Sequence, residues 1–288
     1  MTVNPYNYAP VGTGPFKHVE WFEGINWTLA RNEAYFKGSP NIDGLLLRWD
    51  ITLENLETAL INNEIDLIPG NAIMAINPSN LTIIEQMPGM TTTLKPEFGF
   101  VHMIVNFGNP FLNNINVRQA IASAINKTEI ITNVFSGYAN SSTGPIPPAA
   151  GYWYNPNVTK YDFNLTRAEE LLNQTYPIDP ETGYRFNISL KVPEWDPLII
   201  QAAQLIENWL QQININATLS DPLDSYQFYL DLYVDHDFDL AINELSLISG
   251  FDPDLFALFH TGARWNGGNY SNSYVDLLLE QGRATNNV

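Results

Sequence analysis

The sequence contains no cysteine among its 288 residues, and positive charge is scarce. The lack of cysteine excludes disulfide bonds, thiolate catalysis and zinc sites built on sulfur. Lys and Arg number 13 against 31 Asp and Glu, which gives a formal net charge of −18. Phosphate backbones and anionic lipid surfaces are bound by clustered Lys and Arg. Nucleic acid and anionic membranes are therefore poor partners for this chain.

Long apolar runs and catalytic signatures are missing as well. No apolar run reaches the roughly 18 residues that a membrane-spanning helix needs, and no positively charged leader follows Met1. We therefore expect any export signal to lie outside this sequence. The motifs of phosphate-binding loops, zinc proteases and serine hydrolases do not occur, and the four His are scattered. We expect no metal, no cofactor and no enzymatic activity.

Aromatic residues and asparagine are plentiful. The chain is 45% hydrophobic and 12% aromatic, which is enough for a sizeable core in one large or two ordinary domains. Composition predicts roughly four N-x-S/T sequons. Ten occur, at Asn26, Asn80, Asn126, Asn140, Asn157, Asn164, Asn173, Asn187, Asn216 and Asn269. The excess predicts an extracellular or cell-surface glycoprotein, although an Asn-rich composition alone could also raise the count.

Hydrophobic periodicity predicts alternating strands and helices. The expected strands are 17–22, 27–31, 45–51, 65–68, 102–107, 185–192, 214–220 and 238–245, and the expected helices are 53–61, 78–87, 117–125, 167–174, 197–213, 225–234 and 274–284. Asn116 and Thr166 are the expected caps of two of these helices, and 65–68 reads as a short buried strand. Residues 137–160, rich in Gly, Pro, Asn and Ser, are expected to form a long ordered loop or a crossover. The alternation indicates an α/β sheet with helices on its faces.

The order of these pieces resembles a known family. "GTGPFKHVEWFEGINWTLARNEAYFKG" at 12–38, "ALINNEIDLI" at 59–68, "FLNNINVRQAIASAINKTEII" at 111–131 and "DPDLFALFHTG" at 252–262 carry the resemblance, with "GPIPP", "YDFNLTRAEELL" and "HDFDLAINEL" between them. Together they are similar to the peptide/nickel-type (family 5) extracellular solute-binding proteins of ABC importers, the dipeptide- and oligopeptide-binding group. No single motif decides the match, but their ordered set covers nearly the whole chain.

The resemblance implies a fold and a division of the chain. The family fold is α/β, a two-lobe periplasmic-binding-protein type of the large, peptide-binding class, and the chain is expected to be incomplete at both ends. Residues 1–106 would form part of lobe one and 107–288 most of lobe two, with a hinge near 105–109. Ligand would be captured in the cleft between the lobes, and domain closure would be read by the membrane permease.

The resemblance also implies candidate ligand residues. In peptide-binding members an Asp before a D-P turn holds the ligand's amine, and that position here is Ser249, with Ser246 three residues earlier where Trp is common. The position of an Arg that binds the ligand's carboxylate falls on Pro193. Both charged anchors are therefore replaced in an ungapped overlay. Because such an overlay can be displaced by several residues, Glu244 or Asp252 is an alternative partner for an amine. The full set of candidates is Trp195, Glu194, Ser249, Ser246, Asp252, Trp153 and Trp265.

Each candidate has an ordinary structural explanation as well. The tryptophans can be loop residues packed against helices, and Asp252 and Asp254 can cap the helix that follows them. The expected function is a monomeric extracellular solute receptor for oligopeptides or dipeptides. Alternatives are an oligosaccharide-binding member of the family, because Trp faces also stack on sugars, a secreted glycosidase with two carboxylates, or a receptor sensor domain.

Overall fold

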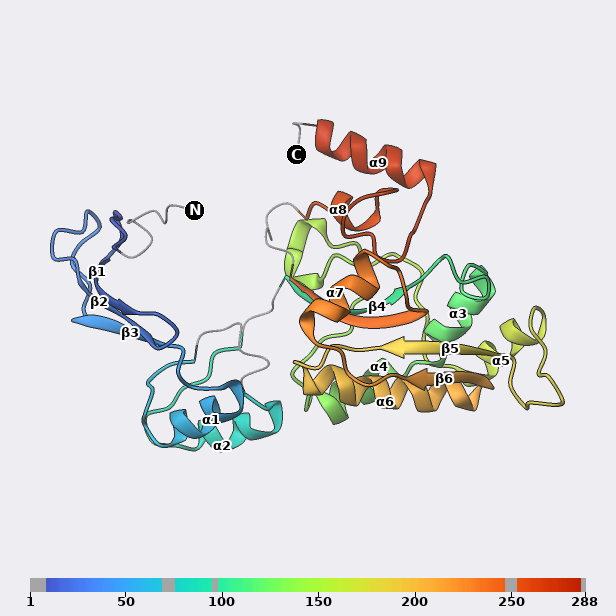
Figure 1. The fold of residues 1–288 in the computed structure, drawn as a ribbon, viewed down its shortest axis with the longest axis horizontal. Helices are drawn as coiled ribbons and strands as arrows, with labels where there is room; N and C mark the ends of the chain where they lie inside the picture. Colours follow the sequence, from blue (N-terminus) through green and yellow to red (C-terminus); the bar gives the residue numbers. More distant parts are fainter. Residues whose placement is uncertain (1–8, 69–75, 95–97, 247–252, 286–288) are drawn as a thin grey trace. The chain divides into compact units, whose positions relative to one another are not determined.

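The chain forms two compact units that divide between Gln86 and Met87. The computed structural model describes residues 9–68, 76–94, 98–246 and 253–285 (Figure 1). Each unit has its own sheet and its own helices, which confirms the mixed α/β content expected from the sequence. In the part of the chain that the structure describes, no helix has the length and apolar character to cross a bilayer.

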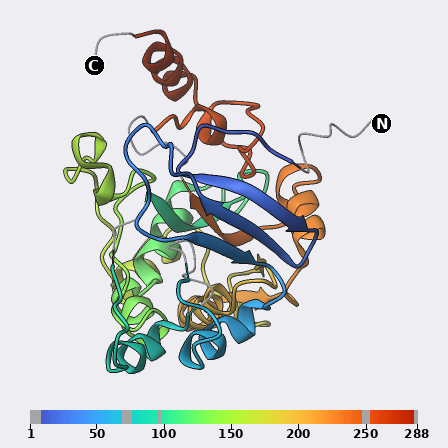
Figure 2. The same cartoon turned by 90° about the vertical axis from the view of Figure 1, so that its left-hand side faces the viewer.

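The first unit contains a three-stranded antiparallel sheet, seen face-on in Figure 2. Its order is β1-β2-β3, and the turn from β1 to β2 uses Gly24 with a φ of 72°. A bulge interrupts the register between His18 and Glu20. The elements of this unit are β1 (Phe16–Phe22), β2 (Asn26–Arg31), β3 (Gly44–Arg48), α1 (Leu53–Ile61), η3 (Pro78–Asn80) and α2 (Leu81–Glu85).

Very little of the first unit is buried. Its buried side chains, among those described, are Ala59, Leu60 and Ile84 on α1 and α2, and Pro78 on η3. No residue of β1, β2 or β3 is buried. The expectation of a short buried strand at 65–68 is wrong, because these residues form no strand and Leu67 is 75% exposed. A run of four apolar-rich residues therefore did not by itself indicate burial.

The second unit is built on a four-stranded mixed sheet of order β4-β7-β5-β6. Its strands are β4 (Gly99–Val105), β5 (Phe186–Lys191), β6 (Ile215–Leu219) and β7 (Leu240–Ser246). β5 runs parallel to β6 and β7, whereas β4 pairs with β7 in the antiparallel sense. Its helices are α3 (Ile115–Ala124), α4 (Lys127–Glu129), η4 (Ile130–Val134), η5 (Pro148–Trp153), α5 (Leu165–Asn173), α6 (Pro197–Gln212), α7 (Ser225–Tyr233), α8 (Phe256–Phe259) and α9 (Ser273–Ala284).

Two hydrophobic cores hold this sheet. The larger joins the sheet to α3, α5 and α6, and the smaller lies beneath α7. Leu190 and Leu240 point into the larger core, while Ala241 belongs to the smaller one. Because successive side chains of a strand point to opposite faces, Leu240 and Ala241 show that the two cores lie on opposite faces of the sheet.

The helices begin at residues close to those expected, but two caps differ. The side chain of Asn114, not that of Asn116, accepts the N–H of residue 116 and starts α3. The side chain of Asn164, not that of Thr166, accepts the N–H of Arg167 and starts α5. In both cases the chain offered two side chains able to cap, and the one further from the helix interior is used.

β4 lies in the sheet of the second unit, although the sequence placed its residues in the first lobe. β4 pairs with β7 along its whole length, so residues 99–105 share a sheet with the second unit. The compact units therefore divide about twenty residues before the expected lobe boundary at 106/107. Which residues act as a hinge in a complete two-lobe protein, 105–109 or others, stays a prediction.

Candidate functional site

The candidate site lies where the parallel strands of the second unit end. In open α/β sheets, ligands bind outside the carboxyl ends of the strands. The segment after β5 is fixed to the segment after β6, because the Glu194 N–H donates to the carbonyl of Leu223 at 2.8 Å and Pro193 bridges the same residue. The residues following β5 are thus held on a rigid frame next to the strand ends.

Trp195 is positioned by its neighbours on both sides. Its ring packs edge-on against Phe228 of α7, with centroids 5.6 Å apart and planes at 90°. The next residue, Asp196, is buried and caps α6 by accepting the N–H groups of Leu198 and Ile199 at 2.9 and 3.2 Å. Burial raises the pKa of Asp196, although these two hydrogen bonds oppose the shift. Trp195 stays half-buried, so part of its ring remains available to a ligand.

Trp265 reaches the same helix from another segment. Its ring meets Tyr233 edge-on at 5.1 Å and Tyr229 at 6.0 Å, and the guanidinium of Arg264 lies 4.9 Å from its centroid. The side chain is 39% exposed. The segment packs so tightly on β4 that a Cβ at Gly268 would collide with the carbonyl oxygen of Val105. Only glycine permits this close approach, and it places Trp265 beside α7.

We call Trp195, Tyr229, Tyr233 and Trp265 the aromatic surface, because each lies on α7 or packs against it. Phe228, the residue of α7 that Trp195 contacts, is itself buried. Tyr229 and Tyr233 are one helical turn apart and therefore share a side of α7. The hydroxyl of Tyr233 accepts a hydrogen bond from the Asn243 amide of β7 at 3.4 Å, and burial raises the pKa of this phenol. Such a surface offers ring faces and a few neutral polar groups, which suits stacking and dispersion contacts.

A partly buried histidine lies on the strand next to Asn243. His102 of β4 pairs in register with Asn243, and its ring contacts Phe100 at 5.0 Å. Its Nδ1 is buried without a hydrogen-bond partner, and burial lowers the pKa of His102 to about 4. The imidazole is therefore neutral near neutral pH.

The remaining candidate residues lie elsewhere or are not described. Glu194 is exposed beside Trp195, and the ring of Trp153 lies edge-on to Tyr152 at 5.3 Å at the end of η5. Ser246 is the last residue of β7 and pairs with Gly99. Ser249 and Asp252 fall outside the described residues. Asp254 accepts the Phe256 N–H at 3.0 Å, but the N-cap position of α8 is Leu255, so the expected cap by Asp254 is not formed.

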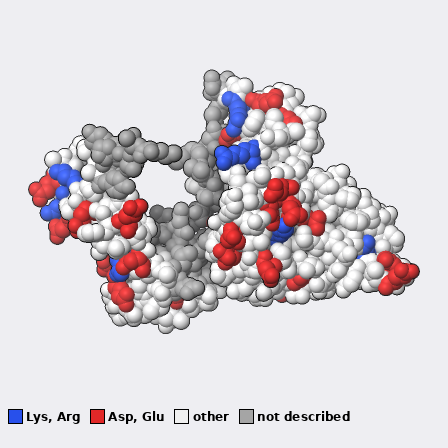
Figure 3. Space-filling model, viewed as in Figure 1, with Lys and Arg blue, Asp and Glu red and all other residues white. Residues whose placement is uncertain are grey.

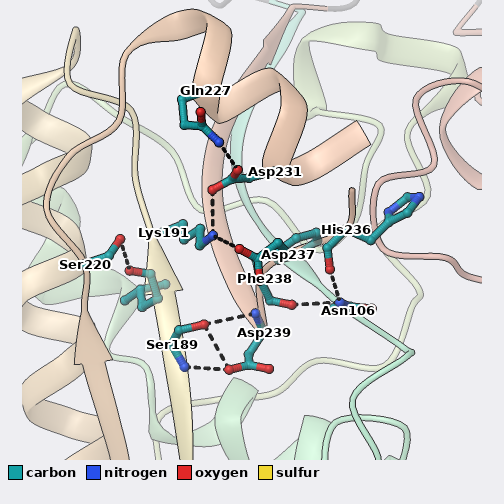
Figure 4. A network of polar contacts seen from close by, with 11 residues as sticks. Asn106, Ser189, Lys191, Ser220, Gln227, Asp231, His236, Asp237, Phe238 and Asp239 are labelled. Carbon is teal, nitrogen blue, oxygen red and sulfur yellow. Dashed lines mark hydrogen bonds and ion pairs between the residues drawn. The ribbon is translucent and has the colours of Figure 1, made fainter. Parts of the chain in front are cut away.

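A polar network fixes α7 to the sheet (Figure 4). Lys191 of β5 donates to Asp231 of α7 at 2.6 Å and to Asp237 at 3.2 Å, and Gln227 donates to the other oxygen of Asp231 at 2.5 Å. Burial disfavours the charge of Lys191, but the hydrogen bonds to both Asp residues outweigh it and raise its pKa. The network orients the helix that carries the aromatic surface.

A second group of polar residues lies around Asp239. One carboxylate oxygen accepts from the Ser189 N–H and hydroxyl at 2.7 and 2.9 Å, and the other accepts from the Asn109 amide at 2.7 Å. An open hollow of about 360 Å³ lies here. Because both oxygens of Asp239 already accept hydrogen bonds, the arrangement serves to tie β5 to the segment after β4. Within the described part of the chain, no three His, Asp or Glu side chains gather as a metal site.

The sequence did not single out α7 as part of the site. The segment "SYQFYLDLYV" was expected to be a helix, and the i, i+4 spacing of Tyr229 and Tyr233 was the available signal.

Acidic residues outnumber Lys and Arg on the face of the molecule that Figure 3 shows, in keeping with the net negative charge of the chain.

Comparison with known proteins places this arrangement in context. Residues 2–267 match the family model described as "Bacterial extracellular solute-binding proteins, family 5 Middle". The peptide transport periplasmic protein SapA of Salmonella typhimurium is 26% identical over 247 residues, which cover 86% of this chain and 43% of that protein. A dipeptide-binding protein of Escherichia coli is 25% identical, over 96% of this chain and 51% of the relative. The chain thus spans about half the length of the relatives it matches.

Solved structures show the same fold. The substrate-binding protein CtaP of Listeria monocytogenes superposes with a TM-score of 0.86 at 24% identity, covering 99% of this chain and 56% of that one. The oligopeptide-binding protein AppA of Bacillus subtilis, solved with a nonapeptide, gives a TM-score of 0.76 at 21% identity over 96% and 56% of the two chains. The expected fold, part of a large two-lobe binding protein, is confirmed.

Proposed function

Because this chain belongs to family 5 of the bacterial extracellular solute-binding proteins, we propose that it is the peptide-capturing component of an ABC importer. The observation that carries this proposal is the match over residues 2–267, together with relatives named for peptides and dipeptides. The protein would act outside the membrane as a monomer and hand its ligand to a permease. These relatives give no support to the oligosaccharide, glycosidase or sensor alternatives.

We propose that the aromatic surface forms one wall of the ligand site. Trp195 and Trp265 are partly exposed on a frame held by α7, and both keep ring area free for contact. Ring faces contact peptide side chains through dispersion and stacking without requiring one sequence. Such a wall suits a receptor that accepts many peptides.

We propose that the preferred ligand is longer than a dipeptide. Pro193, at the position implied for a carboxylate-binding Arg, is buried and bridges Leu223, so it offers no charge to a ligand. A charged terminus enclosed in a site without a partner costs several kcal/mol. A longer peptide can keep its carboxylate in water and avoid that cost.

The protein would bind its ligand without changing it. The relatives are transport proteins, and ATP hydrolysis would belong to the membrane partner. Incubation of the full-length protein with peptides, followed by mass spectrometry, should show intact peptides. Turnover that a single Asp or Glu substitution abolishes would contradict this part of the proposal.

The test of ligand class uses the full-length gene product. Ligands that co-purify from cells should be released by denaturation and identified by mass spectrometry, and calorimetry should then compare a pool of pentapeptides with Gly-Leu as the dipeptide. Peptides of several residues should co-purify, and the pool should bind more tightly than Gly-Leu. Recovery of sugars alone, or tighter binding of Gly-Leu, would contradict the proposal.

A further inference from the structure

The ten sequons of this chain differ in how far their asparagines are already used by the fold. Asn126 caps α4, and its amide donates to the Glu129 carboxylate at 3.2 Å. Asn187 and Asn216 are joined across β5 and β6 by a hydrogen bond of 2.8 Å. A sugar on Nδ2 of Asn126 or Asn216 would replace one of the two hydrogens of a donor that the fold already uses, and a sugar on Asn187 would crowd the amide of Asn216 that donates to it.

Other sequons are constrained by packing. Asn26 lies in β2, and its side-chain oxygen is buried. Asn269 is exposed but follows Gly267 and Gly268, which are both buried against β4 and α7. An enzyme that must bind the residues on either side of the asparagine cannot reach this sequon without unpacking the segment.

Asn157 is free of both constraints. It lies in a run of exposed residues, 155–164, that precedes α5 and contains no helix or strand. Its backbone N–H donates to the Asn155 side chain at 2.9 Å, and among the described residues its own amide makes no hydrogen bond. Thr159, the third residue of the sequon, is exposed as well.

Asn140 lies in the same long loop and is exposed, again with no described hydrogen bond from its side chain. Tyr138, two residues before it, is 39% exposed, and Tyr152 in this loop is 84% exposed. Aromatic faces of this kind stack on sugar rings. The loop therefore combines two accessible acceptors with apolar surface that a sugar would cover.

We propose that Asn157 and Asn140 are N-glycosylation sites that place two glycans on the 137–160 loop of the second unit. The co-substrate is an oligosaccharide linked to a lipid diphosphate. The bond from Nδ2 to C1 of the first sugar forms as the bond from C1 to the phosphate oxygen breaks. The lipid diphosphate leaves, and the amide proton passes to a base of the transferase. The proposal rests on the proposed function in one respect, which is that the protein is exported.

The test is peptide mapping of the full-length protein purified from its own cells. Mass spectrometry should find glycan mass on peptides containing Asn157 and Asn140, and unmodified peptides for Asn126, Asn187 and Asn216. Asn157→Gln and Thr159→Ala should each reduce the intact mass by one glycan. Thr159→Ser, the matched control, keeps the acceptor hydroxyl and should retain the glycan.

The outcomes separate this proposal from the proposed function. Exported protein that binds peptides but carries no glycan at Asn157 and Asn140 would overturn the glycosylation proposal alone. Equal modification of Asn187 and Asn216 would also overturn it, because the folded structure would then have no part in site choice. Protein retained inside the cell would contradict the export on which both proposals depend.

Discussion

Both units contain a sheet and helices, but they bury very different numbers of apolar side chains. The second unit has a four-stranded sheet with a hydrophobic core on each face. The first has a three-stranded sheet with no buried residue and three buried hydrophobic side chains on α1 and α2. Strands therefore pair in both units, whereas burial of apolar side chains, the main stabilising contribution to folding, is concentrated in the second unit.

The strand sequences of the first unit show that its sheet is suited to further contact. Trp27 and Leu29 of β2 lie on the same face as Leu47 and Leu45 of β3, their partners in register. The opposite face is mixed, because Thr28 lies beside Leu46, its partner in register. The apolar face of a sheet normally packs on another layer of structure. Strand pairing without such a layer is not enough to make the first unit an independent domain.

The largest expected effect follows from separating the units. Residues 87–288 produced alone should fold and unfold cooperatively on heating, because both cores lie within them. Residues 1–86 produced alone should show no cooperative transition by circular dichroism, because the few side chains that are buried among the described residues cannot offset the entropy of ordering. A sharp thermal transition in the isolated first unit would break the comparison.

A smaller effect is expected from matched leucine substitutions. Leu190→Ala removes a fully buried side chain of β5 and should lower the free energy of unfolding by about 2–5 kcal/mol. Leu46→Ala in β3 removes a side chain that is 59% exposed and should change it by about 0.5 kcal/mol or less. Urea denaturation of both variants measures the difference. Equal losses would show that β3 is buried by contacts not present in the described residues.

His102 should make the stability of the second unit depend on pH. Its folded pKa of about 4 lies below the ordinary value of 6.5, so the neutral form is favoured by folding. The stability contribution is complete above pH 6.5 and is lost as the pH falls toward 4, by up to about 3 kcal/mol. Urea denaturation at a series of pH values should show this loss.

The control for that measurement is His102→Phe. This variant replaces the imidazole with a ring that does not titrate, and its unfolding free energy should depend less on pH between 6.5 and 4. An imidazole of His102 that titrates near 6.5 by NMR would contradict the burial on which the prediction rests.

The smallest expected effect concerns ligand binding by the full-length protein. Trp195→Ala should weaken the binding of a peptide pool by roughly 1–3 kcal/mol, the range for burying a large apolar side chain. Trp49→Ala is the matched control, since Trp49 is 54% exposed and lies in the first unit, outside the aromatic surface. Calorimetry measures both. Equal weakening by the two substitutions would remove Trp195 from the proposed site.

Much of this arrangement could be predicted from periodicity. The helices α3, α5, α6 and α9 carry apolar side chains at helical spacing, and the strands follow from alternating or continuous apolar runs. The strand at 65–68 was wrong, because a run of four residues does not distinguish a buried strand from an exposed loop. The cap at Asn116 was wrong because neighbouring asparagines are equally able to cap.

The candidate site was only partly predictable. Trp195 and Trp265 were identified by the resemblance, but no local pattern connects residues 70 positions apart, and α7 joins them through tertiary packing. The close approach of Gly268 to β4 likewise depends on the fold and not on its neighbours in sequence. Ser249 and Asp252 remain predictions.

The pairing of β4 with β7 sets an order on how the second unit can assemble. Val105 pairs with Leu240, so the partner strand of β4 is β7, which is synthesised more than 130 residues later. The intervening segments that form β5, α6 and β6 are local and can associate early. Contacts between residues distant in sequence slow folding, and an edge left unpaired during synthesis is a site for aggregation. The rate of translation between β4 and β7 would then determine how long the edge of β4 that pairs with β7 stays unpaired.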